Sequence, residues 1–143
     1  MKKFTWFQIV NVLLVLATIV INVLANALPL NGLNTGEISD RFDILFVPAG
    51  YVFSIWGLIY IGLIAFAIYQ ALPAQRDNAR IEAITPAFVA ASLGNIVWIF
   101  LWHYEKFILT IFAMLVLLVS LISIYLTLRK GKKPTKAEWW CVF

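Results

Sequence analysis

The stretch from Phe107 to Leu128, FILTIFAMLVLLVSLISIYLTL, contains no charged residue. Roughly 20 apolar residues are enough for an α-helix to cross the hydrocarbon core of a bilayer, which is about 30 Å thick. Lipid offers no partner to backbone N–H and C=O groups, so a spanning segment must satisfy them internally, as a helix does. This stretch therefore predicts a membrane-spanning helix and decides the class of the fold.

Three more segments have the same character: Trp6 to Leu28, Phe46 to Ala71 and Thr85 to His103, none of which contains Lys, Arg, Asp or Glu. Of the 143 residues, 63% are hydrophobic and 13% are charged, and the mean hydropathy is +0.92. A soluble domain carries about twice this share of charge. We expect one all-α integral membrane domain over residues 1–143, with four helices in a bundle and a basic tail over residues 129–143.

The basic residues indicate how the helices are oriented. If Lys2 and Lys3 are cytoplasmic, all but two of the eleven Lys and Arg residues fall on the cytoplasmic side, the exceptions being Arg41 and Lys106. Such a bias orients multi-pass proteins. We therefore expect a multi-pass protein of a bacterial cell membrane with both termini in the cytoplasm. We also expect the net charge of +4 to reflect topology, and no nucleic-acid partner.

The N-terminus leaves one alternative open. Lys2 and Lys3, the apolar run and Ala25-Asn26-Ala27 also resemble a cleavable signal peptide. The apolar run is longer than the core of a typical signal peptide. A retained first helix is therefore the preferred interpretation.

Polar and small residues identify the helix faces that avoid lipid. The polar residues of the first segment are Asn11, Thr18, Asn22 and Asn26. At 100° per residue these positions fall within a sector of roughly 80°, which we expect to face the bundle interior. Stripes of small residues, which let helix backbones approach closely within a protomer or across a dimer, occur in the second and third segments. They consist of Gly50, Ser54, Gly57 and Ala65, and of Ala87, Ala90, Ala91 and Gly94.

Alternating helix direction places several amide and aromatic residues in the outer half of the bundle. At 1.5 Å per residue, Trp56 and Asn95 lie about 12 Å below the outer surface. A first loop from Pro29 to Leu45 lies above them. This group predicts a pocket for a flat apolar ligand with polar edges. Its members are Asn22, Trp56, Tyr60, Asn95, Trp98 and Trp102.

Each of these residues also has a purely structural interpretation. Trp102 lies near a water boundary, where tryptophan anchors helices at the membrane interface. Asn22 and Asn95 are suited to hydrogen bonding between helices. Trp56 and Trp98 are too deep for an interfacial role, so they either pack against neighbouring helices or contact a ligand.

Two motifs are similar to those of a known family. The segment from Pro48 to Tyr60, PAGYVFSIWGLIY, resembles the second-helix signature of the TspO/MBR family, the tryptophan-rich sensory or translocator proteins. Asn95-Ile96-Val97-Trp98, followed by Trp102, is similar to that family's third-helix block. The sequence departs from the signature in one respect. Trp56 follows Phe53 by one residue fewer than in the family, and the proline of that gap is absent.

The resemblance implies a five-helix bundle, usually dimeric, with a pocket capped by the first loop. In this family the pocket accepts tetrapyrroles, sterol-like molecules and synthetic aromatic ligands. The residues that match its pocket positions are Trp56, Tyr60, Asn95 and Trp98. Tyr51 occupies the family's aromatic position after the glycine.

The family's fifth helix has no counterpart in this sequence. After the basic tail the chain ends with Ala137 to Phe143, which reads like the interfacial start of a further span. We therefore expect a truncated form of the family's bundle, in which the fifth helix is missing.

These observations favour a membrane binding or sensory protein for hydrophobic planar ligands, such as tetrapyrroles (porphyrins or haem precursors) or sterol-like molecules. Its expected partners are that ligand, membrane lipid and a second copy of the chain as a homodimer. The alternatives are a small membrane transporter and an accessory subunit that needs a partner helix. A proton-driven exporter requires a carboxylate within the bilayer, and the four segments contain none.

Catalysis is not expected from this sequence. No nucleophile with a base, paired carboxylates or phosphate loop can be assembled from the four segments. Cys141 is the only cysteine and His103 the only histidine. We therefore expect no catalytic residues, no metal site and no cofactor.

Overall fold

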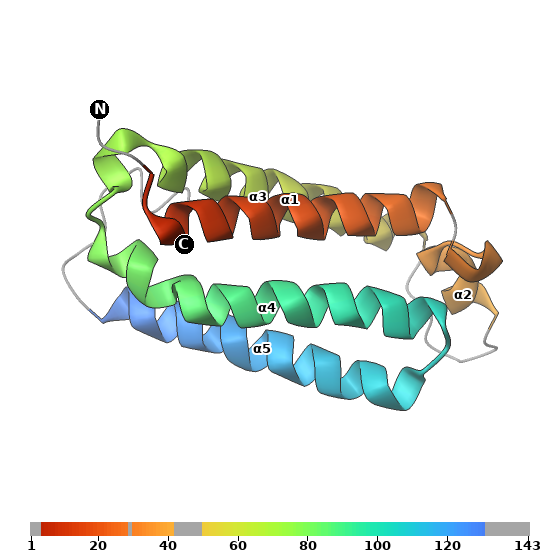
Figure 1. The fold of residues 1–143 in the computed structure, drawn as a ribbon. Helices are drawn as coiled ribbons and strands as arrows, with labels where there is room; N and C mark the ends of the chain where they lie inside the picture. Colours follow the sequence, from red (N-terminus) through yellow and green to blue (C-terminus); the bar gives the residue numbers. More distant parts are fainter. Residues whose placement is uncertain (1–3, 29, 42–49, 131–143) are drawn as a thin grey trace.

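The computed structural model describes residues 4–28, 30–41 and 50–130, and every regular element in this part of the chain is helical. Long α-helices that alternate in direction are joined by shorter helical segments (Figure 1). The long helices are α1 (Trp6–Ala27), α3 (Ile55–Ala71), α4 (Ala79–His103) and α5 (Phe107–Arg129). The short segments are the α-helix α2 (Thr35–Asp40) and the 3-10 helices η1 (Leu30–Gly32), η2 (Gly50–Ser54) and η3 (Pro73–Gln75).

The long helices pack as neighbours in the order α3, α1, α4, α5. The most extensive interface joins α4 to α5, α4 also packs on α1, and α1 packs on α3. One end of the bundle, called here the loop end, carries η1, α2 and the turn between α4 and α5 (Figure 1). The opposite end carries the start of α1, η3 and the end of α5.

Three helices, α1, α4 and α5, are long and apolar enough to cross a membrane. The remaining long helix, α3, has 17 residues, which corresponds to about 26 Å at 1.5 Å per residue. The 3-10 helix η2 precedes it directly and adds roughly 10 Å. The predicted second helix, 46–71, is therefore α-helical only from Ile55 onward. Residues 46–49 lie outside the described part of the chain.

The helix α4 begins at Ala79, so the predicted start of the third helix at Thr85 is wrong. Its cap is Asn78, whose Oδ1 accepts a hydrogen bond from the N–H of Arg80 at 3.0 Å. Thr85 and Pro86 lie inside the helix. The Thr-Pro pair is misleading because a capping threonine followed by proline is also a common way for a helix to begin.

Buried polar side chains share the interior of the bundle with an apolar core around Val15, Phe66 and Ile84, and many large apolar side chains face outward. Asn11 and Asn22 of α1 are 0% and 2% exposed, whereas Leu118 and Val119 of α5 are 52% and 63% exposed. Thr18 of α1 is also buried. The predicted inward face of the first helix is confirmed for these three polar residues. Such an inversion of the soluble pattern is expected where hydrocarbon surrounds the helices.

The two stripes of small residues have different surroundings. A β-carbon added at Gly94 of α4 would lie 3.4 Å from the carbonyl oxygen of Ala113 and 3.5 Å from the backbone nitrogen of Leu117, both on α5. A β-carbon at Gly57 of α3 would meet no atom within 4 Å among the described residues. The stripe on α4 therefore serves close helix packing within the protomer, and Gly57 does not.

A reciprocal pair of glutamines joins α1 to α3 at the end opposite the loop end. Nε2 of Gln8 donates to the carbonyl oxygen of Gln70 at 2.7 Å, and Nε2 of Gln70 donates to the carbonyl oxygen of Gln8 at 3.1 Å. Both side chains are buried. The pair fixes the position of α3 along α1, and with it the depth of the aromatic residues on α3.

Candidate ligand-binding site

A cavity of about 640 Å³ lies at the loop end, between α1, the first loop, α3 and α4. This volume is typical of small-molecule sites, which occupy about 300–1,000 Å³. The lining residues are Asn22, Val23, Asn26 and Ala27 of α1, Asn34, Thr35, Gly36 and Asp40 of the first loop, Trp56 and Tyr60 of α3, and Trp98 and Ile99 of α4. The site is thus built from helices that are far apart in the sequence.

A wall of stacked aromatic rings bounds the cavity on the side of α3 and α4. Trp56 stacks on Trp98, with ring centroids 5.6 Å apart and ring planes inclined by 23°. Tyr60 lies 6.3 Å from Trp56, and Trp102 stacks on Trp98 at 5.9 Å. Aromatic faces are broad and apolar, and they favour offset stacking with other flat groups. The wall therefore offers a surface for a flat ligand.

An asparagine pair links α1 to α4 beside the cavity. Nδ2 of Asn22 donates to the carbonyl oxygen of Thr18 at 2.8 Å and to Oδ1 of Asn95 at 2.7 Å. The carbonyl of Thr18 can only accept, which fixes the orientation of both amides. In this orientation the engaged atoms are Nδ2 of Asn22 and Oδ1 of Asn95. The other two amide atoms, Oδ1 of Asn22 and Nδ2 of Asn95, have no hydrogen-bond partner in the described part of the chain.

A smaller cavity of about 200 Å³ lies farther from the loop end, between α1, α3, α4 and α5. It shares Trp56 and Tyr60 with the larger cavity, and Thr18 and Asn95 add polar groups to its lining. The Thr18 hydroxyl is buried without a hydrogen-bond partner among the described residues. Trp56 and Tyr60 thus stand between two hollow regions of the bundle.

Backbone hydrogen bonds of Thr35 fasten the first loop over the larger cavity. The N–H of Thr35 donates to Oδ1 of Asn26 at 3.2 Å, and its carbonyl oxygen accepts from Nε1 of Trp102 at 3.3 Å. Trp102 therefore supports the aromatic wall with its ring face and holds the loop with its N–H group.

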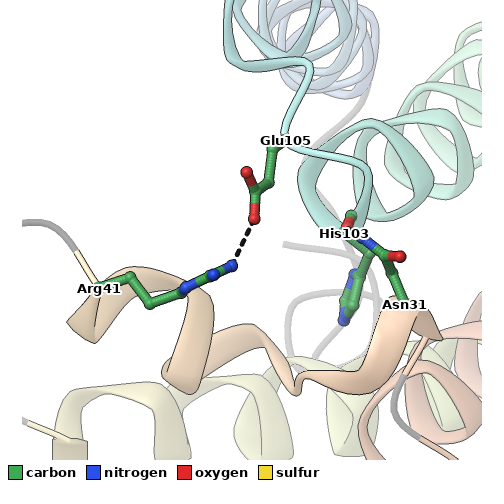
Figure 2. Close-up of polar contacts among 4 residues, drawn as sticks. All are labelled: Asn31, Arg41, His103 and Glu105. Carbon is green, nitrogen blue, oxygen red and sulfur yellow. Dashed lines mark hydrogen bonds and ion pairs between the residues drawn. The ribbon is translucent and has the colours of Figure 1, made fainter.

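Two further contacts join the first loop to the end of α4 and the turn that follows it. Nδ2 of Asn31 donates to the carbonyl oxygen of His103 at 3.2 Å. Figure 2 shows Arg41 extending from the end of α2 to Glu105, where Nη1 lies 2.6 Å from Oε1. Asn31 has a positive φ of 57°, which asparagine tolerates better than most residues. These contacts tie the loop to the end of α4 and to the turn that follows it.

A capping box starts the short helix α2. The N–H of Glu37 donates to Oδ1 of Asn34 at 2.9 Å, and the N–H of Asn34 donates to Oε2 of Glu37 at 2.7 Å. This reciprocal arrangement stabilises a helix N-terminus. It occupies the carboxylate of Glu37 and leaves Asp40, at the other end of α2, as the carboxylate that lines the cavity.

The structure brings most of the predicted site residues to this region. Those that line the larger cavity are Asn22, Trp56, Tyr60 and Trp98. Asn95 lines the smaller cavity, and Trp102 stands behind Trp98. Tyr51, on η2, is 80% exposed and lines neither of these two cavities. Contact of these residues with a ligand stays a prediction.

The sequence analysis does not single out Thr35 and Asp40. Thr35 acts through its backbone, so its side chain carries no signal. Asp40 could have been found, because Asn34 and Glu37 have the spacing of a capping box, which predicts a helix start within the loop. That short helix brings Asp40 over the bundle, but only the tertiary structure shows that it lines the cavity.

Apolar outer surfaces enclose an interior of amides, hydroxyls and aromatic rings. Hydrocarbon removes the cost of exposing leucine, isoleucine and valine, and it penalises exposed polar groups. The fold and the cavity together define a helical integral membrane protein with an internal site of ligand size.

The comparison with family models identifies the family within that class. The model described as "TSPO-like protein" matches residues 8–143. The chain therefore belongs to the TSPO-like family, and the resemblance to TspO/MBR proteins is confirmed. Neither the curated proteins nor the solved structures contain a match to it. Family membership indicates a general role in ligand binding or sensing at the membrane.

Proposed function

We propose that this TSPO-like protein binds a hydrophobic planar molecule in the larger cavity and acts as a binding or sensory protein of the membrane. The ligand classes that suit the site are tetrapyrroles, such as porphyrins, and sterol-like molecules. The family match supports a membrane ligand-binding role in general. The choice of tetrapyrroles and sterol-like molecules follows from the resemblance to TspO/MBR proteins, and the stacked aromatic wall of the cavity supports a flat ligand.

The observation that carries the proposal is the stacked pair of Trp56 and Trp98 at the edge of a cavity of about 640 Å³. The pair is held from behind by Trp102, whose N–H group is bonded to the loop. A stack fixed in this way is ready to receive a flat ring without rearrangement, which lowers the entropic cost of binding.

The chemistry of the lining favours binding over catalysis. Its polar groups are mainly side-chain amides, together with a phenol, a hydroxyl and one carboxylate. Among the described residues, neither Thr35 nor Asp40 makes a hydrogen bond that would pair a nucleophile with a base, which nucleophilic catalysis requires. We therefore propose no catalytic step at this site.

The proposal is tested by titrating the detergent-purified chain with the dimethyl ester of protoporphyrin IX, a neutral planar tetrapyrrole, and following the porphyrin absorption band. Saturable binding near the micromolar range is expected. Replacing either ring of the stack, in Trp56→Leu or Trp98→Leu, should weaken binding by about tenfold or more, because buried tryptophans dominate binding energies.

Trp6→Leu is the matched control for the tryptophan variants. Trp6 lies at the opposite end of α1 and is 61% exposed, so its loss should leave the titration unchanged. Non-saturable binding equal to that of empty micelles, or an equal loss in all three variants, would contradict the proposal.

A further inference from the structure

We infer that the larger cavity selects its ligand by charge, favouring a planar molecule that carries a cationic group over one that carries a carboxylate, and that Asp40 sets this preference. This inference rests on the proposed function and narrows its ligand class.

The lining of the larger cavity carries a single charged side chain, which is acidic. Asp40 is the one charged side chain among the residues that line the cavity, and no Lys, Arg or His of the described chain lines it. Asp40 also makes no ion pair with a described residue. An anionic ligand would therefore enter a site that contains a carboxylate and offers it no cation.

The neighbouring arginine is engaged elsewhere. Arg41 directly follows Asp40 in the sequence, but its guanidinium is paired with Glu105 at 2.6 Å (Figure 2). Figure 2 shows this side chain directed toward the turn between α4 and α5. The ion pair therefore keeps the one basic residue of the first loop from compensating Asp40.

The amide groups point to the same preference. Both N–H groups of the Asn22 amide are used, one by Thr18 and one by Asn95, so the atom it can still offer is the acceptor Oδ1. Asn26 accepts from Thr35 and donates to the carbonyl of Asn22, which leaves it a single neutral N–H. The cavity thus combines one carboxylate and a free amide oxygen with donors that are all neutral, among them the hydroxyls of Thr35 and Tyr60.

The expected size of the selection is modest because Asp40 is exposed. Partly solvated charge pairs change an equilibrium by up to about fivefold. Attraction of a cation and repulsion of an anion add up, so the ratio of the two dissociation constants should be on the order of ten at low salt.

Three probes with one ring system test the inference: anthracenylmethylamine, anthracenylmethanol and anthracenecarboxylate, each substituted at the central ring. Energy transfer from tryptophan to anthracene reports binding to the full chain in a non-ionic detergent. The amine should bind most tightly and the carboxylate most weakly. In Asp40→Asn the ratio of carboxylate to amine dissociation constants should fall below about three, and added salt should lower the ratio in the parent.

Glu82→Gln is the matched control, since it removes the same charge from the exposed first turn of α4, at the opposite end of the bundle. Its ratio should equal that of the parent. Because a ratio is compared, a general loss of affinity in Asp40→Asn cancels. If the neutral alcohol binds but the amine and the carboxylate bind equally, or if both variants lower the ratio equally, the charge selection is wrong and the proposed function stands. If no probe binds saturably, the charge selection is overturned, and the porphyrin titration alone decides the proposed function.

Discussion

Asn22 and Asn95 form a buried amide pair across α1 and α4, with Nδ2 of Asn22 2.7 Å from Oδ1 of Asn95. Both residues are at most 9% exposed. Removal of one partner leaves a polar group unpaired in an apolar interior, whereas removal of both does not. The pair should therefore show energetic coupling.

A double-mutant cycle with Asn22→Ala and Asn95→Ala measures that coupling. Each single variant should lower the free energy of unfolding in detergent by about 1–2 kcal/mol, and the interaction energy should be about 1 kcal/mol. Strictly additive effects would show that the two amides do not stabilise the bundle through each other.

The ion pair between Arg41 and Glu105 should control the loop rather than the whole fold. Its side chains are 57% and 42% exposed, and solvent screening limits such pairs to about 1 kcal/mol or less. In Arg41→Glu, global stability should change little, but amide hydrogen exchange in α2 should accelerate by about two- to fivefold. The exchanged pair, Arg41→Glu with Glu105→Arg, should restore slow exchange. Exchange that remains fast in this double variant would contradict the role of the pair.

The glutamine pair at the opposite end of the bundle should matter for stability and less for binding. Gln70→Leu removes the hydrogen bond that the Gln70 side chain donates to the carbonyl oxygen of Gln8. It keeps the bond from Gln8 to the carbonyl oxygen of residue 70, so we expect a loss of about 0.5–1.5 kcal/mol. Thermal unfolding in detergent measures it. Leu13→Ala, at a residue that is 59% exposed, is the control and should change the midpoint far less. An equal shift in both variants would argue against a specific contribution of the pair.

Gly94 should not tolerate a large side chain, whereas Gly57 should tolerate one. A leucine at Gly94 would press its β-carbon against the backbone of α5, 3.4 Å from the carbonyl oxygen of Ala113, and would force α4 and α5 apart. Overpacking of this kind costs about 1–3 kcal/mol. Gly94→Leu should therefore unfold at a lower temperature than the parent. Gly57→Leu should not, because no atom of the described residues lies within 4 Å of a β-carbon at Gly57. Comparable losses at both positions would mean that the close approach of Gly94 to α5 does not set its tolerance, because leucine has a better helix propensity than glycine at either position.

Much of the fold follows from hydrophobic length and polar periodicity. The fourth predicted helix, 107–128, corresponds to α5 with one more residue. The inward face of α1 follows from Asn11, Thr18 and Asn22, because an amide that faces lipid is costly. Helix starts are less predictable, since Thr85 has the features of a cap but lies within α4.

The helical residues that line the candidate site could be predicted from the sequence, whereas the first-loop residues that cover it could not. Trp56 and Trp98 lie on regular helices, so their depth follows from the rise per residue. Asp40 and Thr35 lie on a loop whose position depends on contacts with Asn26 and Trp102. Such contacts join residues far apart in the chain and leave no periodic pattern. Tyr51 shows the converse case, because the motif that includes it lies on η2, where the side chain is exposed.

The attachment of the loop through Thr35 has a consequence for how this protein can diversify. Both hydrogen bonds at this position use main-chain atoms. Residues of a size that fits this buried position can therefore keep them, with the exception of proline, which has no N–H. Substitutions at this point of the roof can therefore alter what faces the ligand while the roof keeps its place. Selectivity at the mouth of the cavity is free to change in small mutational steps, with the stacked rings below it left intact.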